Sequence, residues 1–281
     1  MKSCVISLAT NDRQYPKGLK RLEQSLKRMK FHGDFIYWDR VYPSDCPTQL
    51  EAPLAFKPFC FLEAKKRGYD LILWIDASGV VVRPLDSIFK TIEQEGYAVF
   101  RNNQKSIGEW CSDEVLNSFN LTREEALKLP EITGGVIGLN MRNEIAVEFL
   151  NRWYEKAIDG ITFRGVRDRF ANWDDYEDMK WNKTKRVSKD PRVRGHRHDQ
   201  TVAGIIVSQL GMKILDQGLA YTIEDALYMR VIILICWDVR GNDKIMSVTQ
   251  IYLRMFVTRY IIRLQASRKH RGIASLTPEN L

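Results

Sequence analysis

The residues with the clearest chemical content are Asp76, Ala77, Ser78 and Gly79, which directly follow the apolar run 71–75. In an open α/β sheet, ligands bind outside the carboxyl ends of the strands, and Asp76 stands at such an end. A carboxylate there can hold a hard divalent cation together with the phosphate oxygens of a nucleotide. Asp is also an ordinary turn residue, so the pattern alone leaves a structural role open.

Two later segments carry further candidates. Gly134 and Gly135 allow backbone conformations closed to other residues and let a ligand approach the main chain, although a strand bulge would explain them equally well. Residues 196–200 read His-Arg-His-Asp-Gln, and we expect Asp199 and Gln200 at the start of a helix. The helix dipole and free N–H groups favour an acid there in any case.

These three segments resemble the motifs of nucleotide-sugar-dependent glycosyltransferases of the GT-A fold. The segments 55–59 and 108–113 add to a similarity with small transferases of bacterial surface-glycan clusters and of large DNA viruses of algae. The resemblance covers residues 1–220. It implies an α/β, Rossmann-like, mostly parallel sheet flanked by helices, and transfer of a sugar from a nucleoside-diphosphate donor to a glycan or other hydroxyl acceptor.

The resemblance also implies roles for particular residues. Thr10 and Asn11, at the end of the first strand, would meet the base and ribose, although both are ordinary turn formers. The full set predicted to bind the donor is Thr10, Asn11, Lys57, Asp76, Ala77, Ser78, Gly134, Gly135 and Gln200. For Lys57, a solvent-exposed helix lysine is the alternative.

Three acids are the candidates for catalysis. Asp199 would bind sugar hydroxyls or face the anomeric carbon. If the enzyme inverts configuration, a carboxylate must take the acceptor proton, and Asp113, Glu109 or Asp199 could do so. If it retains configuration, no such base is required. The sequence leaves both outcomes open.

The expected metal site departs from the family pattern. The resemblance implies that Mn²⁺ or Mg²⁺ binds an Asp-X-Asp motif that closes the strand, with Asp76 as its first residue. The third position is Ser78, whose hydroxyl can ligate a cation weakly but supplies no charge. The remaining ligands would be phosphate oxygens and a distal histidine, His198 in preference to His196, because neutral imidazole suits Mn²⁺. A solvated loop histidine or a phosphate contact is the alternative for this residue.

The surrounding elements fit an α/β fold, because short β-rich runs alternate with helical stretches. Strands are predicted at 4–9, 35–38, 71–75, 80–82, 97–100, 136–139 and 213–215, and helices after Asn143, after a capping box at 122–125, and at 199–210. Periodicity fails over 160–198, which favours a binding loop whose arginines, such as Arg192 or Arg194, could contact a diphosphate.

Composition limits the class of partner. The net charge is +8, but residues 251–281 carry six Lys or Arg against one acid, so most of the excess belongs to the tail and a nucleic-acid partner is not expected. Five cysteines without a Cys-X-X-Cys pair favour a reducing, cytoplasmic location.

Two domains are expected: a glycosyltransferase domain at 1–220 and a basic, apolar, helical extension at 221–281. Residues 245–281 could lie peripherally on an anionic membrane or pack against the domain.

Two other functions stay open. Nucleotidyltransferases that make sugar nucleotides share a related sheet but begin with a Gly-rich, basic phosphate loop, whereas residues 10–18 hold a single glycine. The third hypothesis is a non-enzymatic protein that binds a membrane surface through its basic tail.

Overall fold

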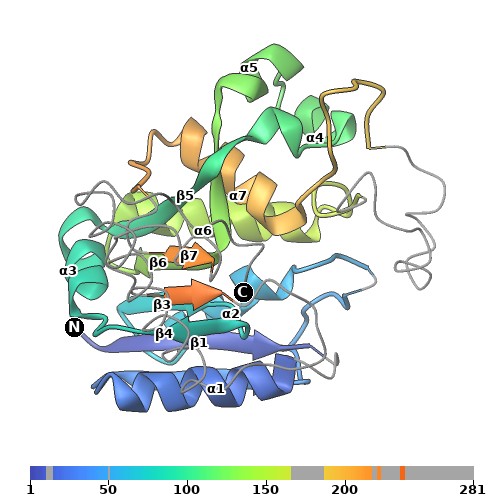
Figure 1. Cartoon of the computed structure of the whole chain (residues 1–281). Coiled ribbons are helices and arrows are strands. Elements are labelled where there is room, and N and C mark those ends of the chain that lie inside the picture. The colour runs from blue at the N-terminus through green and yellow to red at the C-terminus, as the bar shows by residue number, and fades with distance from the viewer. Residues whose placement is uncertain (11–14, 50, 166–186, 217–219, 223–234, 238–281) are drawn as a thin grey trace, which may run out of the picture.

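The structure, a computed structural model, describes residues 1–10, 15–49, 51–165, 187–216, 220–222 and 235–237. Its centre is a five-stranded sheet of strand order β2-β1-β3-β6-β5 (Figure 1). The strands are β1 (Ser3–Ala9), β2 (Asp34–Asp39), β3 (Leu71–Ile75), β5 (Tyr97–Ser106) and β6 (Pro130–Asn140). Because β1 pairs in parallel with β2 and β3 while β6 is antiparallel to β3 and β5, β6 runs against the other strands of this sheet.

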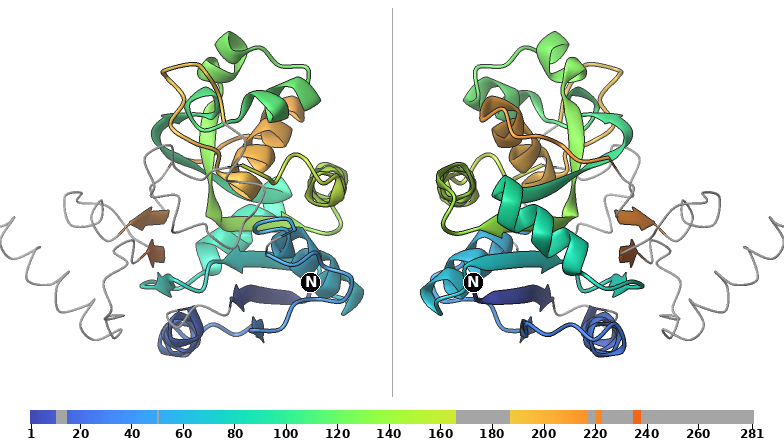
Figure 2. Two further views of the ribbon diagram at one scale, coloured as in Figure 1. Left: turned by 90° about the vertical axis from the view of Figure 1, so that its right-hand side faces the viewer. Right: turned by 90° about the vertical axis from the view of Figure 1, so that its left-hand side faces the viewer.

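Helices cover both faces of this sheet. One face carries α1 (Tyr15–Arg28) and α3 (Asp86–Glu95), and the other carries α2 (Phe56–Lys66), α6 (Glu144–Ile158) and α7 (His198–Gln209). Figure 2 shows α1 and α6 on different sides of the strands. Successive residues of a strand point to opposite faces, so β3 is apolar throughout: Leu73 packs with the α1 side and Trp74 with the α2 side.

A second, smaller sheet begins just after Asp76. It contains β4 (Gly79–Val81), β8 (Ile235–Trp237) and β7 (Ala220–Thr222), in the order β4-β8-β7. The boundary expected between residues 220 and 221 therefore falls inside β7, and 235–237 pair with β4. Most of 221–281, including 245–281, lies outside the described residues, so the division into two domains stays a prediction. No described helix is long and apolar enough to cross a membrane.

The predicted elements are found with some changes of length. The helix after Asn143 is α6, and the capping box at Thr122 opens α5 (Arg123–Lys128). β6 begins at Pro130, earlier than expected, because the glycine segment lies within the strand as a bulge: Val99 pairs with Ile137 but Arg101 with Ile132. β5 is longer than expected for the same reason, and the strand predicted at 213–215 is reduced to one bridge between Phe100 and Leu215.

Candidate active site

A buried lysine connects three elements at the carboxyl end of β3. Lys57 Nζ lies 2.8 Å from Asp199 Oδ2 and 3.2 Å from Asp76 Oδ1, and it donates a hydrogen bond of 2.8 Å to the carbonyl oxygen of Gly134. Its side chain is only 4% exposed, which excludes the alternative of a solvent-exposed helix lysine. An ammonium has three N–H donors, and these three partners match that number.

Each member of this group is placed by a regular element. Lys57 is the second residue of α2, which packs against the β1–β3 face, and Asp199 is the second residue of α7. Asp76 directly follows β3, and its backbone N–H donates to the carbonyl oxygen of Gly135 at 2.9 Å. The pairing of β3 with β6 thus continues up to the bulge, which brings Asp76 beside the glycines.

Asp76 is oriented by a residue that the sequence reasoning missed. The indole Nε1–H of Trp74 donates to Asp76 Oδ1 at 2.7 Å. The two residues are two positions apart, the spacing that returns a strand to the same face. Asp76 is 33% exposed while Asp199 is 2% exposed, so Asp76 is the carboxylate of this pair that solvent reaches.

Gly134 allows the group to be this compact. A Cβ at this position would lie 3.0 Å from Asp199 Oδ2, 3.1 Å from the Cβ of Gln200 and 3.4 Å from Lys57 Nζ, so a side chain would press on three members of the site. The backbone N–H of Gly134 donates to Gln200 Oε1 at 3.0 Å. The predicted Asp76, Lys57, Gly134, Asp199 and Gln200 therefore meet in one place.

Burial and charge act against each other in this group. Burial by itself lowers the pKa of Lys57, but the carboxylates of Asp199 and Asp76 outweigh it and the pKa is raised. Burial raises the pKa of Asp199, and Lys57 offsets part of this rise. The ammonium is therefore charged at neutral pH and serves as counter-ion to two acids.

Behind Gln200 lies a second buried acid that the sequence reasoning also missed. Glu131 has no exposed surface, and its Oε2 accepts hydrogen bonds from Asn102 Nδ2 at 2.7 Å and Arg197 Nη1 at 3.1 Å. Burial raises the pKa of Glu131, against the lowering effect of Arg197 and of the Gln200 side chain. The guanidinium of Arg197 covers the ring of Trp110, 3.8 Å from its centroid. An acid within a strand carries no local sequence signal that would reveal this environment.

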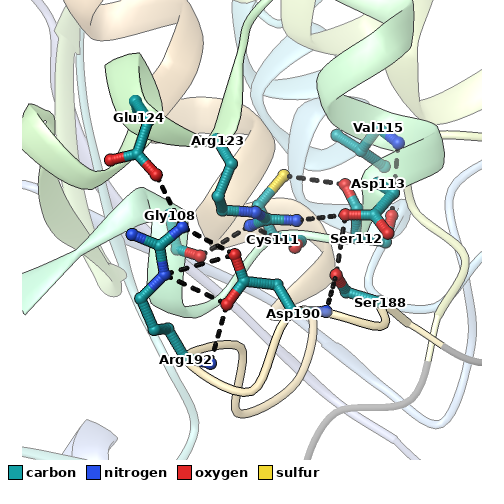
Figure 3. A network of polar contacts seen from close by, with 10 residues as sticks. All are labelled: Gly108, Cys111, Ser112, Asp113, Val115, Arg123, Glu124, Ser188, Asp190 and Arg192. Carbon is teal, nitrogen blue, oxygen red and sulfur yellow. Dashed lines mark hydrogen bonds and ion pairs between the residues drawn. The ribbon is translucent and has the colours of Figure 1, made fainter.

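Asp113 and Glu109 belong to a different part of the molecule, around η1 (Ile107–Glu109) and α4 (Asp113–Ser118). Asp113 Oδ1 accepts from Arg123 Nη2 at 2.6 Å and from Ser188 Oγ at 2.8 Å (Figure 3). Glu109 Oε2 accepts from the backbone N–H and the hydroxyl of Ser106, which caps η1. Both carboxylates thus have structural partners, and their role as acceptor base stays a prediction.

The two arginines proposed for the diphosphate also have acidic partners. Arg192 pairs with Asp190 and, at 2.6 Å, with Glu124 (Figure 3), while Arg194 lies 3.6 Å from Glu109. Thr10 directly follows β1 at the same end of the parallel strands as Asp76. Asn11 and the part 166–186 of the predicted binding loop lie outside the described residues.

The described residues do not fit a divalent-cation site at Asp76. Its Oδ1 faces two donors, Trp74 Nε1 and the Lys57 ammonium, and Ser78 adds no charge. The His198 ring is buried with Nδ1 2.9 Å from the Phe163 carbonyl oxygen, and His196 Nε2 lies 2.9 Å from that of Thr162. No group of three or more His, Cys, Asp or Glu side chains suited to a metal occurs in the described part of the chain. The Mn²⁺ or Mg²⁺ cofactor therefore stays a prediction.

The fold and the position of this group define an α/β protein whose site lies at the carboxyl end of the central strands. Among solved structures, the chain resembles a glycosyltransferase involved in the glycosylation of the major capsid of PBCV-1, with a TM-score of 0.51 and 11% sequence identity over 92% of this chain and 100% of that one. The likeness confirms the predicted GT-A fold class.

The galactosyltransferase LgtC, solved with donor and acceptor sugar analogues, matches with a TM-score of 0.44 and 10% identity over 98% of each chain. No protein-family model matches the sequence. No curated protein matches it either.

Proposed function

We propose that this chain is a glycosyltransferase that moves a sugar from a nucleoside-diphosphate donor to a hydroxyl acceptor, with its reaction centre at Asp76, Lys57 and Asp199. The observation that carries the proposal is this buried ion group at the carboxyl end of β3, closed by the bulge at Gly134. The likeness of the fold to a glycosyltransferase supports it.

The chemistry of the group suits an activated sugar. In the transfer, the bond between the anomeric carbon and the diphosphate oxygen breaks, and the acceptor oxygen forms the new bond to that carbon. The acceptor proton passes to a carboxylate base or to the departing diphosphate. Positive charge develops on the sugar as the diphosphate leaves, so a fixed carboxylate beside the ring is favourable. Asp76 is the partly exposed carboxylate of the group, and we place it against the hydroxyl groups of the donor.

Lys57 and Asp199 set the position and charge of Asp76. The ammonium of Lys57 and the indole N–H of Trp74 hold Asp76 Oδ1 in one position, while Asp199 and the Gly134 carbonyl hold the ammonium in place. Such pre-organisation spares the enzyme the reorganisation that a mobile side chain would require. The proposal covers hexose and pentose donors and a glycan acceptor. None of its steps requires a metal.

The test begins with a panel of UDP-, GDP- and dTDP-sugars, scored by thermal stabilisation of the wild-type protein and by release of the nucleoside diphosphate. With the donor that stabilises most, Asp76→Ala should lower kcat/KM at least about 100-fold, as expected for loss of a fixed charge at the reacting sugar. Glu124→Ala, which removes an exposed carboxylate, is the matched control and should keep the wild-type rate.

Turnover of wild-type magnitude in Asp76→Ala would remove Asp76 from the reaction. Release of pyrophosphate from a nucleoside triphosphate and a sugar phosphate would instead assign the chain to the nucleotidyltransferases.

A further inference from the structure

One face of α1 lies against the turn that carries Asp76. Gly18, Arg21 and Ser25 occur three and four residues apart, so they share a face of the helix. All three are buried, and they meet residues 77–81, which include the turn and β4. Figure 1 shows α1 running along the lower side of β1 and β4.

Each of these three residues contacts a different part of that segment. Arg21 Nη2 donates to the carbonyl oxygen of Ser78 at 2.5 Å, across 57 positions of sequence. Ser25 Oγ accepts a hydrogen bond of 3.0 Å from the backbone N–H of Val81. Gly18 lies so close that a Cβ there would overlap the carbonyl oxygen of Ala77. The helix therefore contacts the main-chain atoms of the segment from Ala77 to Val81 and holds that segment in place.

The opposite side of the turn is fixed by the sheet. The backbone N–H of Asp76 donates to Gly135 at 2.9 Å, and that of Gly79 closes the turn on the carbonyl oxygen of Asp76 at 2.7 Å. The carboxylate of Asp76 is thus attached to a turn held between β6 and α1. A displacement of about 1 Å in a positioned group is enough to slow a reaction about 100-fold.

We infer that Arg21 is a positioning residue for the donor-binding turn, and that it acts on the reaction through the Ser78 carbonyl and hence through Asp76. This inference rests on the proposed function. Arg21 suits the role because its guanidinium is planar, permanently charged and buried, so its hydrogen bond is strong and its direction is fixed. Ser78, the motif position that lacks a charge, then contributes its main chain to the site.

The test compares two arginines that act at opposite ends of β3. Arg21→Met removes the donor to Ser78, and the control Arg142→Met removes the ion pair with Asp70, which precedes the strand. With the nucleotide sugar identified in the panel, Arg21→Met should lower kcat/KM for the donor at least about 10-fold and leave the acceptor KM within about twofold. Arg21→Lys, which keeps the charge and a donor but lacks the planar guanidinium, should recover part of this loss.

Gly18→Ala provides a second route if Arg21→Met fails to fold. Alanine favours the helix, so α1 is retained, while its Cβ pushes on the Ala77 carbonyl. The donor kcat/KM should again fall with the acceptor KM unchanged. The inference is overturned if either folded variant keeps the donor kcat/KM within about twofold of wild type, or if Arg142→Met loses as much as Arg21→Met. If the wild-type protein neither binds nor turns over any sugar nucleotide, the proposed function fails and this inference fails with it.

Discussion

Two groups of charged residues in this protein differ chiefly in burial. In the group at the end of β3, the side chains of Lys57 and Asp199 are 4% and 2% exposed, while that of Asp76 is 33% exposed. The network in Figure 3 is open: Asp113 is 54% and Glu124 69% exposed. The outer network has the shorter ion pairs, at 2.6 Å against 2.8 and 3.2 Å. Contact distance therefore does not distinguish the proposed reaction centre from the outer network.

Burial is the better guide because it has a cost. Removing a charge from water costs several kcal/mol unless partners compensate, whereas an exposed pair contributes little either way. Lys57 is surrounded by Asp199, Asp76 and the Gly134 carbonyl, which compensate that cost in one place. Buried ionisable groups with displaced pKa values at a strand end are typical of reaction centres.

The largest effect should follow from removing the buried cation. Lys57→Met leaves Asp199 buried without its counter-ion, so we expect the free energy of unfolding to fall by about 3–5 kcal/mol. Donor turnover should fall by at least about 100-fold in the protein that remains folded, as for Asp76→Ala, since Asp76 loses its fixed position. Urea unfolding and steady-state kinetics measure the two effects. A loss of stability with full activity would separate the ion group from the reaction.

Lowering the pH should destabilise the protein through the buried His196 and leave the interactions of the outer network unchanged. Burial lowers the pKa of His196 to about 4, whereas hydrogen bonds from Arg192 hold the pKa of Asp190 at about 2. The unfolded chain binds a proton at His196 near pH 6.5, so stability is complete above that pH and falls as the pH drops toward 4, by about 3 kcal/mol. Wild type and His196→Gln, unfolded in urea across this range, isolate this contribution. Equal slopes for the two proteins would contradict the assignment.

Restoring the missing motif acid should change the response to metal. In the wild-type protein, Mn²⁺ should change the affinity for the best-binding nucleoside diphosphate less than about threefold, because Asp76 has the ammonium of Lys57 beside it. Ser78→Asp adds a second carboxylate and should gain about tenfold in affinity on addition of Mn²⁺. Calorimetry in EDTA and in Mn²⁺ measures the affinity of both proteins for the nucleoside diphosphate. A wild-type affinity that collapses in EDTA would show that ligands outside the described residues complete a metal site.

The smallest effect should come from the open network. Asp190→Ala removes one of the two acidic partners of Arg192, yet we expect the melting temperature to stay within about 2 °C and donor kcat/KM within about twofold of wild type. Raising the salt concentration should make the two proteins more alike, because solvent screens exposed pairs. A large loss of activity here would mean that the loop end at 187–194 takes part in the reaction.

Most of the helices and strands could be predicted from the sequence, because local patterns of residue types determine them. The run that forms β3 was predicted with its observed bounds, and Asn143 and Thr122 cap α6 and α5 as their types indicate. Asp76 at the strand end followed from the same reasoning. The glycines at 134 and 135 were found, although their place inside β6 depends on pairing with β5.

The partners in the site could not be predicted, because they meet across long stretches of chain. Lys57 reaches Gly134 across 77 positions, and Arg21 reaches Ser78 across 57. A lysine or arginine on an amphipathic helix has the same local pattern whether it ends in water or in the core. Glu131 illustrates the limit, since its burial and its contact with Arg197 arise only after β6 and α7 pack together.

The most direct test of the central claim is a crystal structure of the protein with the nucleotide sugar that stabilises it most. We expect a sugar or ribose hydroxyl within about 2.6–3.2 Å of an Asp76 carboxylate oxygen, with Lys57 still between Asp76 and Asp199. A donor bound away from the end of β3, with Asp76 facing only solvent, would contradict the account.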